Sequence, residues 1–210
     1  MKKTIVIMTK SSKITGFCVA GIDIQTGEWI RLVSDDEIGE GAVALKDMIY
    51  QDGTEMQILD VVTIECLDHV PTAAQCENYL YDSRYYWQKI GKYLLDDVFE
   101  LIECQNKGYV FENTNRFLEE FEVTGESLLL VSISDIALHV SFNPYKNKNQ
   151  YRIDFTYNNK KYNDFSVSDI KLKNRYKSVG DYLISGEHYA VFSLTGEFKG
   201  KCYKMLAQLF

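Results

Sequence analysis

The sequence consists largely of short β-prone segments separated by glycine and asparagine turns, and few folds accommodate such a pattern. Residues 4–8 form a β-branched run typical of a buried strand. Residues 17–24 and 28–33 are two apolar segments joined by a short connection that ends at Gly27, which predicts a hairpin. Residues 57–67 again show the pattern of a strand. Strands this short and this closely spaced predict a small, partly closed β-barrel.

The last third of the chain shows the same pattern. Two apolar strands are predicted between residues 127 and 142, and residues 151–157 then alternate cleanly between apolar and polar. Asn158 and Asn159 tolerate the positive φ angles of a tight turn, which predicts another hairpin. Residues 189–194 and 200–210 predict a final hairpin. A second barrel is therefore expected here.

The stretch between these two regions has a helical pattern. From residue 85 to residue 102 the apolar side chains recur in steps of three and four, which predicts an amphipathic helix. A weaker helix is predicted over residues 115–122, and a single helical turn over 45–49. The predicted fold is mostly β with minor α: a barrel over 1–72, a helical connecting segment over 73–125 and a second barrel over 126–210.

No part of the sequence resembles a membrane span or a secretion signal. Apolar runs stay well below the ~18 residues that a bilayer-spanning helix needs. Lys10, Ser11 and Ser12 follow the first apolar run almost directly, too early for a signal peptide. We therefore expect a cytoplasmic protein with no membrane partner.

The cysteines and histidines do not form a metal-binding pattern. The five cysteines are scattered and include no Cys-x-x-Cys pair, whereas disulfide scaffolds and zinc sites need close, even spacing. The three histidines also lack such spacing. The sequence thus predicts no metal and no cofactor.

Two arrangements of reactive side chains remain as alternatives to a binding function. Glu77 and Asp82 are two nearby carboxylates of the kind that a metal-dependent hydrolase uses, although a structural role is favoured for them. A Cys76 nucleophile with His69 as its base would require the fold to bring them together. The sequence contains neither a P-loop nor a nucleophile elbow. We therefore predict a protein without catalytic activity.

Charge is distributed unevenly along the chain. Residues 1–140 hold 11 Lys and Arg against 24 Asp and Glu, whereas residues 141–210 hold 12 against 6. The overall charge of −7 argues against a general polyanion binder, because phosphate contacts dominate such affinity. The basic last third is compatible with a nucleic-acid ligand, and the acidic N-terminal half with a protein partner.

Basic and aromatic residues occur together in this last third, which holds half of the 28 aromatic residues. Single-stranded nucleic acid binds in cationic grooves where aromatic rings stack on the bases. In a strand, Lys201 and Tyr203 would share one face, and Cys202 and Lys204 the other. The alternative is that the rings form the core and the lysines a solvated face. The candidate residues are Lys171, Lys173, Arg175, Lys199, Lys201, Tyr203 and Lys204.

Further candidates lie in the first barrel. Trp29 and Arg31 are two residues apart in a predicted strand, so they point to the same side. On an open barrel face they would suit base stacking and a phosphate contact; alternatively, Arg31 pairs with one of the many nearby acids. Lys10 and Lys13, in the polar segment after the first strand, complete the candidate set.

Segments from both ends and the middle of the chain match the pattern of one family in the right order. These are residues 9–13, 16–23, 27–34, 59–62, 77–82, 155–157 with Tyr162, 191–197 and 202–207. They resemble the prokaryotic dual OB-domain proteins, a largely uncharacterised family. The resemblance implies two OB-like barrels, with variable loops at 35–55 and 145–150. Nucleic-acid binding follows from the barrel type by analogy.

The leading hypothesis is therefore a dual OB-like module that binds nucleic acid, preferentially single-stranded DNA or RNA. A protein-interaction accessory subunit that uses the barrels as a scaffold is the first alternative. A metal-dependent hydrolase is the second.

Overall fold

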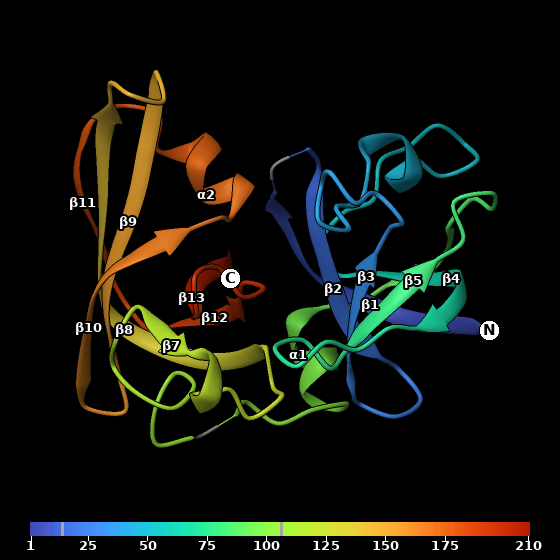
Figure 1. Cartoon of the computed structure of the whole chain (residues 1–210), viewed down its shortest axis with the longest axis horizontal. Coiled ribbons are helices and arrows are strands. Elements are labelled where there is room, and N and C mark those ends of the chain that lie inside the picture. Colours follow the sequence, from blue (N-terminus) through green and yellow to red (C-terminus); the bar gives the residue numbers. More distant parts are fainter. Residues whose placement is uncertain (14, 106) are drawn as a thin grey trace. The chain divides into compact units, whose positions relative to one another are not determined.

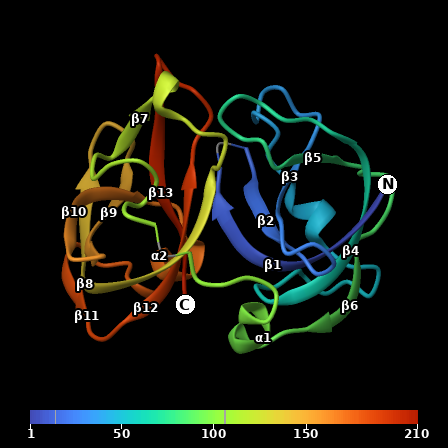
Figure 2. The same cartoon turned by 90° about the horizontal axis from the view of Figure 1, so that it is seen from below.

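The structure is a computed structural model that describes residues 1–13, 15–105 and 107–210. The chain divides into two compact units, Met1–Glu103 and Cys104–Phe210. In each unit the strands curl into a small barrel (Figures 1 and 2). The prediction of a mostly-β fold with two barrels is confirmed.

The first unit is a closed five-stranded barrel with an additional edge strand. Its elements are β1 (Lys2–Ser12), β2 (Phe17–Asp23), β3 (Trp29–Val33), the 3₁₀ turn η1 (Leu45–Met48), β4 (Asp60–His69), β5 (Asn78–Tyr81), β6 (Gln88–Lys92) and α1 (Leu95–Phe99). β1, β2 and β3 form a meander, and β3 pairs in parallel with β5. β4 lies between β5 and β1 and closes the barrel, while β6 pairs with β4 outside this ring. η1 confirms the helical turn predicted near residue 45.

Apolar side chains from every strand of this ring fill the interior, as the alternation in the sequence predicts. Ile5 and Ile7 of β1 pack with Ile30 and Leu32 of β3, and all four are at most 1% exposed. Gly21 is required where β2 pairs with β1, because a Cβ atom there would lie 2.2 Å from the carbonyl oxygen of Val6. The barrel is therefore closed around an apolar core.

The prediction of a helix over residues 85–102 is wrong. Its first half forms β6, which pairs with β4, and only the five residues of α1 are helical. Trp87 is buried, but Ile90 and Leu94 are 60% and 71% exposed, so the predicted apolar face is not buried as a unit. Backbone pairing with β4 outweighs the helical periodicity here. Residues 73–103, predicted as part of a separate connecting segment, therefore belong to the first unit.

The second unit has its own five-stranded ring. Its elements are β7 (Phe117–Glu119), η2 (Glu120–Glu122), β8 (Leu128–Asn143), β9 (Lys148–Tyr157), β10 (Lys160–Val167), α2 (Ile170–Arg175), β11 (Gly180–Ile184), β12 (His188–Leu194) and β13 (Lys201–Leu209). β8, β9 and β10 form a meander, β10 pairs in parallel with β13, and β12 lies between β13 and β8. β11 pairs with β8, and β7 with β13, outside the ring.

Local details of the second unit explain where the predictions hold and where they fail. Asn158 and Asn159 have φ angles of 52° and 60°, which confirms the predicted turn between β9 and β10. Two strands were expected between residues 127 and 142, but this segment forms one strand, β8. A bulge near Asp135 takes up one extra residue, so the pairing with β9 continues on both sides of it. The weak helix predicted over residues 115–122 is wrong, since β7 and the 3₁₀ turn η2 occupy it.

His139 on β8 provides a pH-dependent link to β11. Its Nδ1 lies 2.7 Å from Asp181, and its Nε2 lies 3.4 Å from Asp154 of β9. The hydrogen bond with Asp181, followed by the charge of Asp154, raises the pKa of His139 above its usual 6.5. A histidine with a raised pKa stabilises the fold fully below about pH 6.5, and this contribution is lost as the pH rises through the folded-state pKa.

We therefore expect the contribution of His139 to the unfolding free energy to fall as the pH rises above 6.5, so that the stability difference between the wild type and the His139→Gln variant shrinks. Urea unfolding followed by circular dichroism at several pH values measures it. Parallel pH profiles for the two proteins would contradict the assignment.

Candidate functional site

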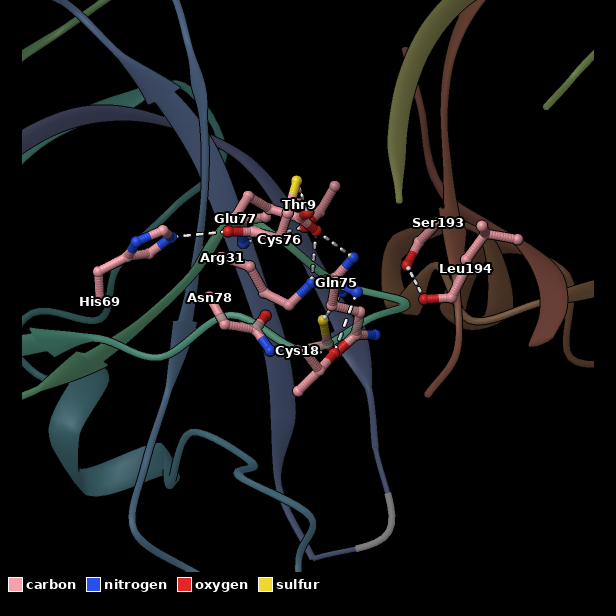
Figure 3. A network of polar contacts seen from close by, with 12 residues as sticks. Thr9, Cys18, Arg31, His69, Gln75, Cys76, Glu77, Asn78, Ser193 and Leu194 are labelled. Carbon is pink, nitrogen blue, oxygen red and sulfur yellow. Dashed lines mark hydrogen bonds and ion pairs between the residues drawn. The ribbon is translucent and has the colours of Figure 1, made fainter. Parts of the chain in front are cut away.

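A buried ion pair lies on the third strand of the first barrel (Figure 3). Arg31 is 3% exposed, and its Nε and Nη2 lie 3.0 and 2.9 Å from one carboxylate oxygen of Glu77. Glu77 immediately precedes β5, and the parallel pairing of β3 with β5 places Arg31 opposite Asn78. The backbone N–H of Arg31 also donates to the carbonyl oxygen of Glu77. Strand pairing therefore holds this ion pair at the barrel wall.

Thiol and amide groups surround the ion pair (Figure 3). Nη1 of Arg31 lies 3.0 Å from the Cys18 sulfur on β2. Asn78 is 5% exposed, and its amide nitrogen donates to the Gln75 side chain at 3.4 Å. Burial opposes the charge on Arg31, but the neighbouring Cys18 and Glu77 outweigh it and raise the pKa of the guanidinium. The guanidinium is thus held charged within the wall.

Of the two alternatives for Arg31, the structure shows the ion pair. The interpretation of Trp29 and Arg31 as an open stacking face is wrong, because Glu77 takes the guanidinium and Trp29 is half-buried with a fully buried Nε1. Parallel pairing brings Glu77 to this strand from 46 positions away in the sequence. Local alternation could not reveal that partner.

The residues of the two catalytic alternatives lie in defined contacts. Nε2 of His69 lies 2.7 Å from the backbone oxygen of Cys76, so the ring is engaged by the carbonyl group. Burial and the neighbouring Glu77 raise the pKa of the Cys76 thiol, which disfavours the nucleophilic thiolate. Asp82 binds Arg84 through two hydrogen bonds of 2.8 and 2.6 Å. Both proposed hydrolase carboxylates are therefore paired with arginines.

Lys10 lies in β1, and Lys13 directly follows this strand. Lys10 forms an ion pair with Glu55 and lies over the Phe17 ring. Lys13 is half-buried and donates to the carbonyl oxygen of Glu40, and burial lowers the pKa of its amine. Neither amine is a freely solvated cation.

Lys204 of β13 is a core residue. It is 1% exposed, and its Nζ donates to the carbonyl oxygens of Val110 at 2.7 Å and Asn113 at 2.5 Å. The predicted alternation is confirmed: Cys202, Lys204 and Leu206 share the inward face of β13. The prediction that Lys204 contacts phosphate is therefore wrong, because closure of the barrel turns its face inward.

Lys199, Lys201 and Tyr203 form a second group on the hairpin between β12 and β13. Lys199 is exposed beside the Phe198 ring, whereas Lys201 lies 3.9 Å from the Phe117 ring centroid and 3.6 Å from Glu119. Tyr203 is 39% exposed. The group combines cations and rings, but one of its cations has an acidic partner.

Lys171, Lys173 and Arg175 lie on α2, which Figure 1 shows beside β9. Lys171 and Arg175 are one helical turn apart and line a pocket of about 130 Å³ with Tyr176 and His188. Lys173 lies on another side of the helix, over the Tyr151 ring of β9 at 6.0 Å.

Contacts with β9 bring further cations to this helix. The Tyr151 hydroxyl donates to the backbone oxygen of Lys173 at 3.3 Å, and Asn149 donates to that of Lys177 at 2.7 Å. Lys148 lies close enough to Lys173 that its charge contributes, after burial, to lowering the pKa of the Lys173 amine. We call α2, the segment that follows it and the β8–β9 hairpin together the α2 surface. The cations and tyrosines of these segments are Lys146, Lys148, Lys171, Lys173, Arg175 and Lys177 with Tyr145, Tyr151 and Tyr176.

The two basic groups of the second unit do not converge. Asp169, the N-cap residue of α2, accepts a hydrogen bond from the backbone N–H of Leu209, so the helix sits at the end of β13. Lys201 begins the same strand, eight residues earlier, which corresponds to roughly 26 Å along the strand. Among the residues that the structure describes, the two groups therefore lie at opposite ends of β13.

Many of the rings counted in the basic third are core residues. Phe155 stacks on Tyr162 with centroids 4.8 Å apart and also packs against Phe165 and Phe192. All four are at most 2% exposed. The alternative that the rings form the core thus holds for these four, whereas Tyr145 is 97% exposed.

Four residues of the α2 surface are not among the candidates that the sequence predicts: Lys146, Lys148, Tyr145 and Tyr151. They lie at or beside the connection between the first and second strands of the second barrel. In barrels with oligonucleotide ligands, this connection, the second and third strands, and the loop between the fourth and fifth strands form the binding face. Their position in that hairpin is a signal that could have identified them.

Both units share one topology, in which the strands follow the ring order first, second, third, fifth, fourth. The third and fifth strands pair in parallel, and a helical element lies between the third and fourth. These features define a protein with two OB-type barrels.

Comparison with known families agrees with this class. The profile described as "Dual OB-containing domain" matches residues 3–209, and the chain belongs to that family. No curated protein and no solved structure matched significantly.

Two further observations concern the residues that the structure describes. No helix among them is long and apolar enough to cross a bilayer. No group of three or more His, Cys, Asp or Glu side chains among them is arranged to hold a metal ion.

Proposed function

We propose that this dual OB-type protein binds single-stranded nucleic acid through the α2 surface and acts as a binding module without catalytic activity. The observation that carries the proposal is the grouping of six cations with three tyrosines on α2 and the β8–β9 hairpin. Cations contact phosphates, and tyrosine faces stack on unpaired bases.

The charge environment supports this surface over the others. Five cations of the second unit form ion pairs outside the α2 surface: Lys107, Arg116, His139, Arg152 and Lys201. The nearest acid along the helix, Asp169, is 1% exposed and accepts hydrogen bonds from the backbone groups of Leu172 and Leu209. The Asp169 carboxylate is therefore buried rather than presented at the surface of α2.

The position of the surface agrees with how OB-type barrels bind. The β8–β9 hairpin is the connection between the first and second strands, one of the loops that contact oligonucleotides in this architecture. In the first barrel the third strand holds the Arg31–Glu77 pair, in which the carboxylate of Glu77 already compensates the charge of the guanidinium. The second barrel is thus the better candidate for phosphate contacts.

Fluorescence anisotropy with labelled single-stranded DNA and RNA tests the proposal. We expect affinity to fall as salt rises, with a logarithmic slope of about −0.7 per phosphate contact. The Lys171→Glu/Arg175→Glu double variant should bind at least about tenfold more weakly and lose roughly 1.4 units of slope.

Matched variants localise the effect. Lys161→Glu changes an exposed lysine near the opposite end of β10 and should retain nearly full affinity. Lys201→Glu tests the hairpin group separately. Absence of binding at tens of micromolar protein, salt-independent binding, or equal weakening by Lys161→Glu would each overturn the proposal. Co-purification with a specific protein and no nucleic-acid affinity would instead favour an accessory subunit.

A further inference from the structure

The first unit contains a cleft of about 480 Å³ outside the Arg31–Glu77 cluster. It is lined by residues from β1, β4 and β6, the segment 50–52, and the connection between β5 and β6. A second hollow of about 290 Å³ adjoins it, and Arg84, Tyr85 and Tyr86 line both. Small-molecule sites commonly have volumes of 300–1,000 Å³. The cleft is therefore large enough for a small ligand.

Two aromatic rings stand in the wall shared by these hollows. Tyr85 and Tyr86 are 58% and 63% exposed, which is high for adjacent aromatic residues. Beneath them Trp87 is 2% exposed and packs edge-on against Tyr81 with centroids 5.6 Å apart. The connection is thus anchored in the core while its two tyrosines remain available for stacking.

Cations and carboxylates are placed around these rings. The Arg84 guanidinium lies 6.0 Å from the Tyr85 ring centroid, and its bonds to Asp82 use Nε and Nη2. Lys2 pairs with Glu65 at 3.2 Å at the rim, where both side chains are substantially exposed. The cationic side chains can donate to an anion, and the carboxylates can accept from amino groups. Both lie beside the planar faces of the two tyrosine rings.

Tyr50 and Lys89, in the floor of the cleft, are anchored to a buried carboxylate. Asp60 is fully buried, and its carboxylate accepts from the Tyr50 hydroxyl at 2.9 Å and pairs with Lys89 at 2.7 Å. Lys89 itself is 40% exposed at the side chain and lines the cleft. A preorganised floor reduces the entropy that binding would otherwise cost.

We propose that this cleft binds a nucleoside phosphate, with the base stacked on Tyr85 or Tyr86. The phosphate contacts Arg84, Lys2 or Lys89, and the exocyclic amine of the base donates to Glu65 or Asp52. A nucleoside phosphate has a planar heterocycle, amino donors and an anionic group. These three groups match the tyrosine rings, the carboxylates and the cations of the lining, in that order. This site is separate from the α2 surface and does not depend on it.

Isothermal titration calorimetry of the full chain with AMP, CMP, GMP and UMP tests the proposal, with ribose 5-phosphate as the ligand that lacks a base. We expect AMP, GMP and CMP to bind at least tenfold more tightly than ribose 5-phosphate. Tyr85→Ser or Tyr86→Ser should weaken AMP binding about tenfold, the size expected for one base–aromatic stack. Circular dichroism checks that each variant folds.

Two controls separate this site from the proposed function. Tyr145→Ser removes a tyrosine that is 97% exposed in the second unit and should leave AMP affinity unchanged. The Lys171→Glu/Arg175→Glu variant should also bind AMP normally. Absence of AMP binding at millimolar concentration, equal binding of ribose 5-phosphate, or full retention of affinity in both tyrosine variants would overturn the inference. Oligonucleotide binding that needs Tyr86, without AMP binding, would overturn it as well.

Discussion

Replacing Arg31 by methionine is expected to lower the free energy of unfolding of the first unit by about 3–5 kcal/mol, because the change leaves the Glu77 carboxylate buried without its ion-pair partner. Glu77 is 7% exposed, so water cannot readily replace the guanidinium. Both tryptophans, Trp29 and Trp87, lie in the first unit. Urea unfolding followed by tryptophan emission therefore reports on this unit.

Two further variants separate burial from charge. Arg31→Met/Glu77→Leu removes both charges and should recover much of the lost stability, since a buried ion pair replaced by apolar groups is often close to neutral. Lys2→Met breaks the exposed pair with Glu65 and should cost less than about 1 kcal/mol. A loss below 1 kcal/mol for Arg31→Met would show that the guanidinium is not held in the buried pair.

Replacing Lys204 by methionine is expected to destabilise the second unit by about 2–4 kcal/mol, because the carbonyl oxygens of Val110 and Asn113 lose their buried donor. Circular dichroism should report the loss, while the tryptophan-detected transition of the first unit stays unchanged. Lys199→Met, at an exposed position on the neighbouring hairpin, should stay within about 0.5 kcal/mol of the wild type. Equal stability of the Lys204 variant and the wild type would refute this role.

The same lysine should make stability depend on pH. Burial lowers the pKa of Lys204 to about 7, below its value in the unfolded chain. Between about pH 7 and 10 the unfolded chain then binds more protons, so the unfolding free energy contributed by Lys204 rises with pH. The cost of Lys204→Met should therefore be larger at pH 9 than at pH 6. A pH-independent cost would contradict the lowered pKa.

Arg31 and Lys204 are the two most buried cations in the candidate set. Their replacement is predicted to lower the free energy of unfolding and to leave the nucleic-acid affinity unchanged. Replacement of Lys171 and Arg175 is predicted to lower the nucleic-acid affinity and to leave the free energy of unfolding unchanged. Measuring stability and affinity for both pairs distinguishes architecture from function within one protein.

The strands and their alternation could be predicted from the sequence because they depend on neighbouring residues. The pattern of β13 placed Lys201 with Tyr203 and Lys204 with Cys202, and the turn at Asn158 and Asn159 identified its hairpin. Side-chain alternation in a strand and positive φ in a turn are local properties of the chain. Such features need no tertiary information.

The helix predicted over residues 85–102 failed because its competitor was not local. The spacing of Trp87, Ile90 and Leu94 favours a helical face, but the backbone of this segment finds β4 as a partner. Pairing with a strand some 25 residues earlier depends on how the barrel closes. Periodicity within one segment carries no information about that closure.

The sequence by itself therefore determined the class of fold, the turns and which side chains share a strand face. The tertiary structure alone decided which face points inward, so that Lys204 is in the core, and which distant carboxylate Arg31 meets. It also decided that the cations of α2 lie beside the β8–β9 hairpin and that Tyr85 and Tyr86 border a cleft. The physical reason is that burial and ion pairing depend on contacts between residues far apart in the chain, which only barrel closure creates.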